Sequence, residues 1–240
     1  MARARKRHIQ RELVYWGGKR EGAGRPARGP RSSQPHTRRP EHQAAHPVHC
    51  TLRLESDIGT LRTPGLYDAC RRALASVLRR ADFRVIDISL QHGHVHMIVE
   101  ADDRMALSRG MQAFQIVAAR FINRVVSAAR GEARRGRVFV DRFHAHVLRT
   151  PREVRHARAY VMNNWRRHGE DRRAPKHWVL DPFSSAVAFG GWRETNGEVF
   201  VAPADYPPLG VARAQTWLMN VGWQKHGLIS THERPGPLRR

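Results

Sequence analysis

Two histidines separated by one residue, His94 and His96, are the side chains of this sequence best suited to carry out chemistry. They lie within residues 86–100, whose apolar and β-branched residues are typical of β-strands. Because side chains alternate between the two faces of a strand, both imidazoles are expected on one face and Val95 on the other. The motif indicates a two-ligand metal site or a proton-handling pair held on a rigid element. A purely structural pair of histidines is the alternative, unless a further reactive group joins them.

That further group is predicted on a downstream helix. Pro151 suits the first turn of a helix that we expect to run to about His168. Tyr160 and Asn164 are one turn apart on it and share a face. A neighbouring apolar stripe that can pack on a sheet consists of Val154, Val161 and Trp165. The topology therefore permits Tyr160 and Asn164 to point at the pair of histidines.

The elements that would position these groups follow from hydrophobic periodicity. We expect strands over residues 48–54, 83–90, 94–100 and 138–148, and helices over residues 63–80, 104–129 and 151–168. The resulting order, β-α-β-β-α-β-α, predicts an α+β fold in which an antiparallel sheet has its helices packed on one face.

The composition favours a nucleic-acid partner. The chain has 43 Lys and Arg against 21 Asp and Glu, a formal net charge of +22. Charge of this size repels itself unless a polyanion neutralises it, although proteins of GC-rich genomes also drift toward Arg. No apolar run suits a membrane helix. Two cysteines without CxxC spacing, Cys50 and Cys70, argue against a disulfide scaffold or a Cys-type zinc site, so a location in the cytoplasm, on the nucleoid, fits.

Three segments are expected along the chain. Residues 1–46, with 12 Lys or Arg against 3 Glu, are predicted to form a disordered basic tail. Its Gly22-Ala23-Gly24-Arg25-Pro26 stretch resembles the minor-groove core of an AT-hook, with Arg25 as the contact, but a solvated tail that binds phosphates without preference is the favoured interpretation. Residues 47–169 are expected to form the folded domain that carries the candidate catalytic groups.

Residues 170–240 are expected to form an irregular extension that ends in a short helix over about residues 210–225. Its aromatic and basic residues would either stack on unpaired bases or fill a small core: Trp178, Trp192, Arg193, Trp217 and Trp223.

The combination of a His-Val-His strand with a later Tyr helix resembles the HUH single-strand endonucleases. Within them the chain is most similar to the single-tyrosine transposases related to the insertion sequence IS200, and among these to the REP-associated tyrosine transposases. The resemblance covers about residues 46–192 and includes three further stretches: residues 138–149, Tyr160-Val161-Met162-Asn163-Asn164, and Asp181-Pro182-Phe183-Ser184-Ser185. This chain has His92-Gly93 where family members often carry Pro-Asn, and Asn164-Trp165 where they often carry Asn-Pro. Neither departure removes a catalytic group.

The resemblance implies a ferredoxin-like or RRM-like HUH domain and a defined chemistry. His94, His96 and Asn164 would bind a divalent cation, Mg²⁺ or Mn²⁺. Tyr160 would attack the scissile phosphate of single-stranded, hairpin-forming DNA and leave a 5′-phosphotyrosine bond, which a second strand's 3′-OH can reverse without ATP. The protein would act as a monomer or a homodimer.

Other basic residues are expected to contact DNA or solvent. Arg142 and Arg149 are plausible phosphate contacts, together with Arg25 in the tail. His144 and His146 share a strand face and are expected to contact DNA or solvent rather than a second metal.

Two other functions remain open at this point. One is a domesticated protein that recognises DNA hairpins without cutting them, which the intact His94, His96 and Tyr160 disfavour. The other is an RNA-binding α+β module, which needs the basic charge and the sheet but not the histidines or the tyrosine.

Overall fold

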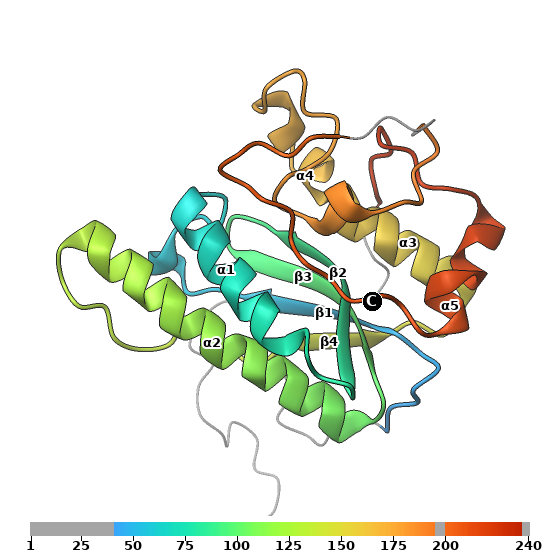
Figure 1. The fold of residues 1–240 in the computed structure, drawn as a ribbon, viewed down its shortest axis with the longest axis horizontal. Helices are drawn as coiled ribbons and strands as arrows, with labels where there is room; N and C mark the ends of the chain where they lie inside the picture. Colours follow the sequence, from blue (N-terminus) through green and yellow to red (C-terminus); the bar gives the residue numbers. More distant parts are fainter. Residues whose placement is uncertain (1–40, 195–199, 237–240) are drawn as a thin grey trace, which may run out of the picture. The chain divides into compact units, whose positions relative to one another are not determined.

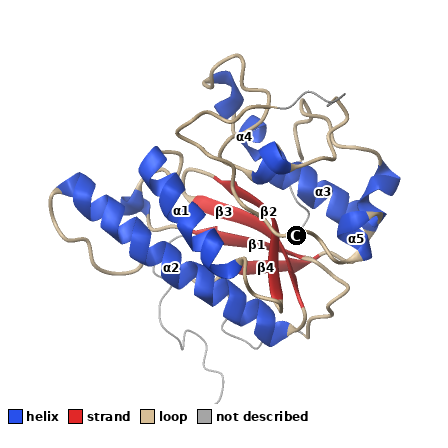
Figure 2. Cartoon of the chain, in the orientation of Figure 1, coloured by secondary structure: helices blue, strands red, loops and turns tan. Residues whose placement is uncertain are grey.

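A four-stranded antiparallel sheet organises the part of the chain that the computed structural model describes, residues 41–194 and 200–236. Its strands are β1 (Val48–Arg53), β2 (Phe83–Leu90), β3 (His94–Ala101) and β4 (His144–Val147), in the spatial order β2-β3-β1-β4. Neighbouring strands all pair antiparallel. Figure 2 shows this sheet with helices around it. The α+β class and the antiparallel sheet predicted from the sequence are confirmed.

Two long helices cover one face of the sheet. These are α1 (Pro64–Val77) and α2 (Arg104–Arg130), which lie side by side across the strands in Figure 1. The Asp103 side chain caps the start of α2 by accepting a hydrogen bond from the Ala106 N–H, and Gly131 ends it in the left-handed conformation. At Gly110 the helix approaches the sheet so closely that a Cβ atom would lie 2.1 Å from the ring of Phe83.

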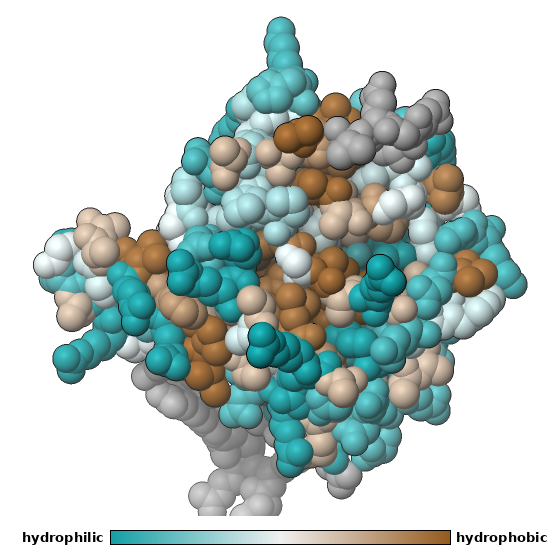
Figure 3. Space-filling view, in the orientation of Figure 1, coloured by the Kyte–Doolittle hydropathy of each residue, from teal (hydrophilic) through white to brown (hydrophobic). Residues whose placement is uncertain are grey.

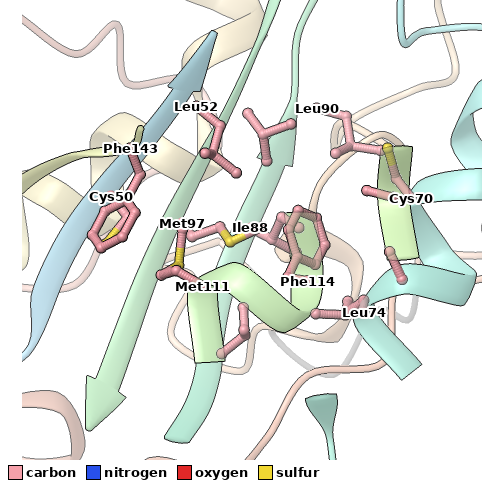
Figure 4. Packing of buried hydrophobic residues seen from close by; sticks show 14 of the residues in the cluster. Cys50, Leu52, Cys70, Leu74, Ile88, Leu90, Met97, Met111, Phe114 and Phe143 are labelled. Carbon is pink, nitrogen blue, oxygen red and sulfur yellow. The ribbon is translucent and has the colours of Figure 1, made fainter. Parts of the chain in front are cut away.

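The main hydrophobic core lies between these helices and the sheet. Alternate residues of the strands point into it, as periodicity of two requires. Figure 4 shows part of this packing, in which Met97 and Ile88 of the sheet lie near Met111 and Phe114 of α2. The other face of the same strands is thereby left for the histidines and for a second layer.

The opposite face carries a third helix, α3 (Pro151–Met162). The prediction that the helices share one face was therefore right for α1 and α2 but not for α3. The reason is that this face also holds apolar residues, and a smaller second core joins Ile86 and Ile98 of the sheet to Val154 and Val161 of α3. A capping box between Thr150 and Glu153 starts α3.

Shorter elements complete the described chain. They are the short helices α4 (Asn164–Arg167) and α5 (Trp217–Asn220) and the 3₁₀ helices η1 (Ser56–Ile58), η2 (Glu170–Arg172), η3 (Ser185–Ala188) and η4 (Gly222–His226). The helix expected over residues 210–225 is thus reduced to α5 and η4. The helix expected over residues 151–168 is interrupted at Asn163, which separates α3 from α4. The Asn163 side-chain amide donates a hydrogen bond to the Ser230 carbonyl.

The strand expected over residues 138–148 is also shorter than predicted. Only its last part is β4; before it, Val140 N–H donates to the Arg53 carbonyl, and the Arg142 N–H donates to the Asp141 side chain, which bends the chain. Arg25 and the AT-hook-like stretch lie outside the described residues. Residues 41–46, at the end of the predicted tail, contact the domain: the His42 ring bonds the Ala101 carbonyl at 2.9 Å.

The surface agrees with the basic composition. Hydrophilic side chains occupy most of the face seen in Figure 3 and surround a limited patch of hydrophobic ones. No helix within residues 41–194 and 200–236 is long and apolar enough to cross a membrane.

Candidate active site

The predicted pair of histidines lies on β3 and faces the layer that contains α3. The rings of His94 and His96 are 4.7 Å apart between centroids and nearly perpendicular, at 82°. In the sheet, His96 lies between Thr51 of β1 and Ser89 of β2. His96 is 5% exposed, whereas His94 is half-buried. Both imidazoles therefore share one face, as expected from their spacing.

Two side chains of β1 lie within hydrogen-bond distance of one ring nitrogen of His96. Its Nδ1 lies 3.1 Å from Thr51 Oγ1 and 3.2 Å from Nε2 of His49, whose ring stacks on His96 at 18°. A hydroxyl or ring nitrogen that accepts from Nδ1–H selects the tautomer whose Nε2 carries the free lone pair. That Nε2 is buried and has no hydrogen-bond partner among the described residues. The ring is thus oriented in the way that metal-binding histidines usually are.

The imidazoles are neutral at physiological pH. Burial is the main cause and lowers the pKa of His94 to about 4, that of His49 to about 3, and that of His96 well below 6.5. Neighbouring histidines, which repel a second positive charge, lower these pKa values further. Neutral imidazole is the form that binds a cation.

Tyr160 packs directly on this group. Its ring lies 5.0 Å from that of His96 at 88° and 6.0 Å from that of His49 at 78°. The guanidinium of Arg167 lies 5.7 Å from the Tyr160 ring centroid. Tyr160 is half-buried, so it lies against the histidines and still reaches solvent. The structure therefore brings together the tyrosine and the His pair that the sequence singled out.

The helix that carries Tyr160 is fixed from both sides. Toward the sheet, Arg158 forms a buried ion pair with Asp87 at 2.9 Å. Toward the C-terminal segment, the same guanidinium lies 4.8 Å from the Phe189 ring and 5.0 Å from the Trp223 ring. Arg155 adds an ion pair with Glu233. These contacts set the rotation of α3, and with it the direction in which Tyr160 points.

Asn164 follows the break in the helix and is fully buried. Neither its Oδ1 nor its Nδ2 has a hydrogen-bond partner among the described residues. Tyr160 contacts His96, and His168 contacts His94 at 5.9 Å between ring centroids. Asn164 therefore lies, in the sequence, between two residues that each contact one histidine of the pair.

The cluster does not contain a third acidic, thiol or imidazole ligand. Across residues 41–194 and 200–236, no three side chains of His, Cys, Asp or Glu form a group that would hold a metal ion. Among the described residues, a third protein ligand beside His94 and His96 would be an oxygen group of another kind: an amide, a hydroxyl or a backbone carbonyl.

The remaining predicted contacts lie around this group. His144 and His146 of β4 pair with Thr51 and His49, so they occupy the same sheet face one strand away. Arg142 is half-buried and Arg149 is exposed, at the two ends of β4. His92 pairs with Glu170 at 2.8 Å.

The tryptophans of the extension divide between core and surface. Trp192 and Trp223 are buried in the second core, and Trp178 is half-buried beside Tyr206. Trp217 is 51% exposed. Trp217 is thus the most exposed of this set, while the buried pair belongs to the second core that includes α3.

Sequence reasoning missed His49 and His168. The alternation of residues 48–53 would have placed His49 and Thr51 on one strand face, but nothing in the sequence says that β1 lies beside β3. His168 lies two helical turns after Tyr160 in the sequence, and its position depends on the break at Asn163.

Comparison with known proteins agrees with the arrangement. Residues 43–164 match the model of the family described as "Transposase IS200 like". The fold resembles a solved structure of a REP-associated tyrosine transposase bound to a REP hairpin, with 21% sequence identity and a TM-score of 0.48, over 63% of this chain and 82% of that one. No curated protein matches the chain.

Proposed function

The chain belongs to the IS200-like transposase family, and from that premise we propose that it cuts and rejoins single-stranded DNA with Tyr160 as the nucleophile. The observation that carries the proposal is the contact between the rings of Tyr160 and His96, 5.0 Å apart. A tyrosine on a helix fixed by Arg158, with its ring against neutral imidazoles, supports a covalent mechanism.

The proposed reaction is a transesterification at phosphorus. The Tyr160 oxygen loses its proton and bonds to the phosphorus, while the bond to the 3′ oxygen of the preceding nucleotide breaks and that oxygen leaves as a hydroxyl. The product is a 5′-phosphotyrosine on one strand and a free 3′-OH on the other. Attack by another 3′-OH releases Tyr160 and joins the strands, so the bond energy is conserved.

The residues around Tyr160 fit a divalent cation, Mg²⁺ or Mn²⁺. The unpartnered Nε2 of His96, the neutral ring of His94 and the buried, unpartnered amide of Asn164 are the groups that would hold it. When bound, the cation would polarise the scissile phosphate and stabilise the departing oxygen. His49 and Thr51 orient His96, and Arg167 lies over the Tyr160 ring, where its charge favours a nearby phosphate.

The DNA partner is supported by charge and by the family. A net charge of +22 favours a polyanion. Arg149 is exposed at the end of β4, and Arg142 lies at the other end, so both are proposed to contact phosphates. A hairpin is the proposed form of the substrate, because the similar transposase was solved with a REP hairpin. Arg25 is proposed to add a contact from the tail.

The experiment that tests this proposal uses the full-length protein. It is incubated with end-labelled single-stranded hairpin DNA and Mn²⁺, denatured, and separated on a gel. A covalent protein–DNA adduct is expected with the wild type and none with Tyr160→Phe, whose ring can keep the contact with His96. An adduct that persists in Tyr160→Phe would remove the nucleophile assignment.

The same experiment separates the alternatives. Tight binding of hairpin DNA without an adduct, under every metal tried, would favour a protein that recognises hairpins but no longer cuts them. Binding of RNA with indifference to DNA would favour an RNA-binding module. The contact between Tyr160 and His96 supports the transposase function, because neither alternative function requires it.

A further inference from the structure

Gln91 is a buried polar residue at the end of β2 that nothing so far explains. It is 1% exposed. Its Nε2 donates a hydrogen bond to Ser89 Oγ at 2.7 Å, whereas its Oε1 is buried and has no hydrogen-bond partner among the described residues. A buried acceptor without a partner loses the hydrogen bonds that water would give it, so it destabilises the fold. An amide whose nitrogen is hydrogen-bonded and whose buried oxygen is not is therefore a candidate ligand for a cation.

The sheet places this amide beside the His pair. The Gln91 N–H donates to the His94 carbonyl at 2.9 Å, so these two residues face each other across the hairpin. Ser89 lies directly opposite His96. Ser89 and His96 share the sheet face on which Tyr160 of α3 packs. Gln91, one residue beyond β2, reaches the same face through its bond to Ser89. The hydrogen bond to Ser89 therefore brings the Gln91 amide to the residue that lies opposite His96 in the sheet.

Three buried groups of the described chain share the same property. His96 Nε2, Asn164 Oδ1 and Gln91 Oε1 each carry a lone pair and each lacks a hydrogen-bond partner in the described chain. His96 turns its Nδ1 toward β1, so its Nε2 points away from that strand. A cation bound between groups of this kind would satisfy their lone pairs together.

We propose that Gln91 Oε1 is a further ligand of the divalent cation held by His94 and His96. The inference rests on the metal site of the proposed function and deepens it. With Asn164, the protein would supply two imidazole nitrogens and two amide oxygens. Amide oxygens suit Mg²⁺ and Mn²⁺ better than imidazole alone does, so Gln91 would shift the site toward these harder cations and away from Zn²⁺.

The test measures metal binding without DNA. Mn²⁺ is titrated into the metal-free, full-length protein, and free Mn²⁺ is followed by its electron paramagnetic resonance signal. Gln91→Met keeps the length of the side chain but removes the oxygen, and should raise the Kd for Mn²⁺ at least tenfold. Gln91→Glu keeps an oxygen and adds negative charge, and should bind Mn²⁺ more tightly than the wild type. Gln112→Met, on the exposed face of α2, is the matched control and should bind like the wild type.

The outcomes separate this inference from the proposal beneath it. Wild-type affinity in Gln91→Met, with binding abolished in His94→Ala, would overturn the role of Gln91 and leave the His site intact. Failure of the wild type to bind Mn²⁺ would overturn both. If thermal unfolding in EDTA shows that Gln91→Met does not fold, Gln91→Glu decides: tighter binding than the wild type supports the inference, and equal or weaker binding overturns it.

Discussion

Nε of Arg158 lies 2.9 Å from Oδ2 of Asp87, and this buried ion pair joins the helix of Tyr160 to the edge strand β2. Both side chains are almost entirely removed from water, at 9% and 3% exposure. The guanidinium also donates to the Met219 carbonyl, so one residue connects the sheet, α3 and the C-terminal segment. The position of the proposed nucleophile therefore depends on a contact made on the opposite side of its own helix.

Removal of one partner of this pair should destabilise the protein strongly. Arg158→Met leaves Asp87 buried without its cation, and we expect a loss of about 3 kcal/mol in the free energy of unfolding. Urea unfolding followed by circular dichroism measures it. Arg152→Met, an exposed position on the same helix, is the control and should change stability by less than about 0.5 kcal/mol. If the double change Arg158→Met and Asp87→Leu is no more stable than Arg158→Met alone, the unpaired charge is not the cause.

A second prediction concerns the hydroxyl that orients His96. Thr51→Val keeps the shape of the side chain but removes an acceptor 3.1 Å from Nδ1. Without it the ring can adopt the other tautomer, and the affinity for Mn²⁺ should fall about tenfold, as is usual when the partner of a metal-binding histidine is lost. Calorimetric titration of the metal-free protein measures the affinity. Unchanged affinity in a folded Thr51→Val protein would show that His49 alone holds the ring.

The buried imidazoles make stability depend on pH with a definite sign. His49 has a pKa of about 3 in the folded protein, because burial disfavours its charged form, and an ordinary value near 6.5 when unfolded. Below pH 6.5 the unfolded chain therefore binds more protons than the folded one, and stability falls as the pH is lowered. His49 alone should cost about 3 kcal/mol between pH 7 and pH 4.

The melting temperature, measured from pH 8 to pH 4, should accordingly decline below about pH 6.5. His49→Phe, which cannot be protonated, should flatten this decline. A profile with the same slope in the variant would show that other groups control the acid response.

Much of this arrangement was readable in the sequence, and the missing parts have physical causes. The spacing of His94 and His96 predicts their common strand face, and the i, i+4 spacing of Tyr160 and Asn164 predicts a shared helix face. The strand order was not readable, because hydrophobic alternation reports which face a residue takes but not which strand lies beside it. Therefore the contribution of His49 and Thr51 to His96 was not foreseen.

The behaviour of Asn164 has a similar cause. The i, i+4 rule assumes an unbroken helix, whereas the Asn163 amide bonds the Ser230 carbonyl, 67 residues further along the chain, and the helix ends. A contact so distant in sequence leaves no local signal. The proposed role of Gln91 could not be predicted for another reason. An isolated amide at a strand end is common in sequences, and only its burial and its unpartnered oxygen single it out.

The last prediction compares the effects of replacing two adjacent asparagines, Asn163 and Asn164. Asn164→Leu replaces a fully buried amide without hydrogen-bond partners by an apolar group of similar size, and should stabilise the metal-free protein by about 1 kcal/mol. The same change removes a proposed ligand, so added Mn²⁺ should raise the melting temperature less than in the wild type. Asn163→Leu is the matched control: its amide donates to Ser230 at 2.9 Å, and its loss should lower stability by about 1–3 kcal/mol. Thermal unfolding in EDTA and then in Mn²⁺ measures both effects. If Asn164→Leu is destabilised in EDTA as much as Asn163→Leu, the Asn164 amide serves the fold rather than the cation.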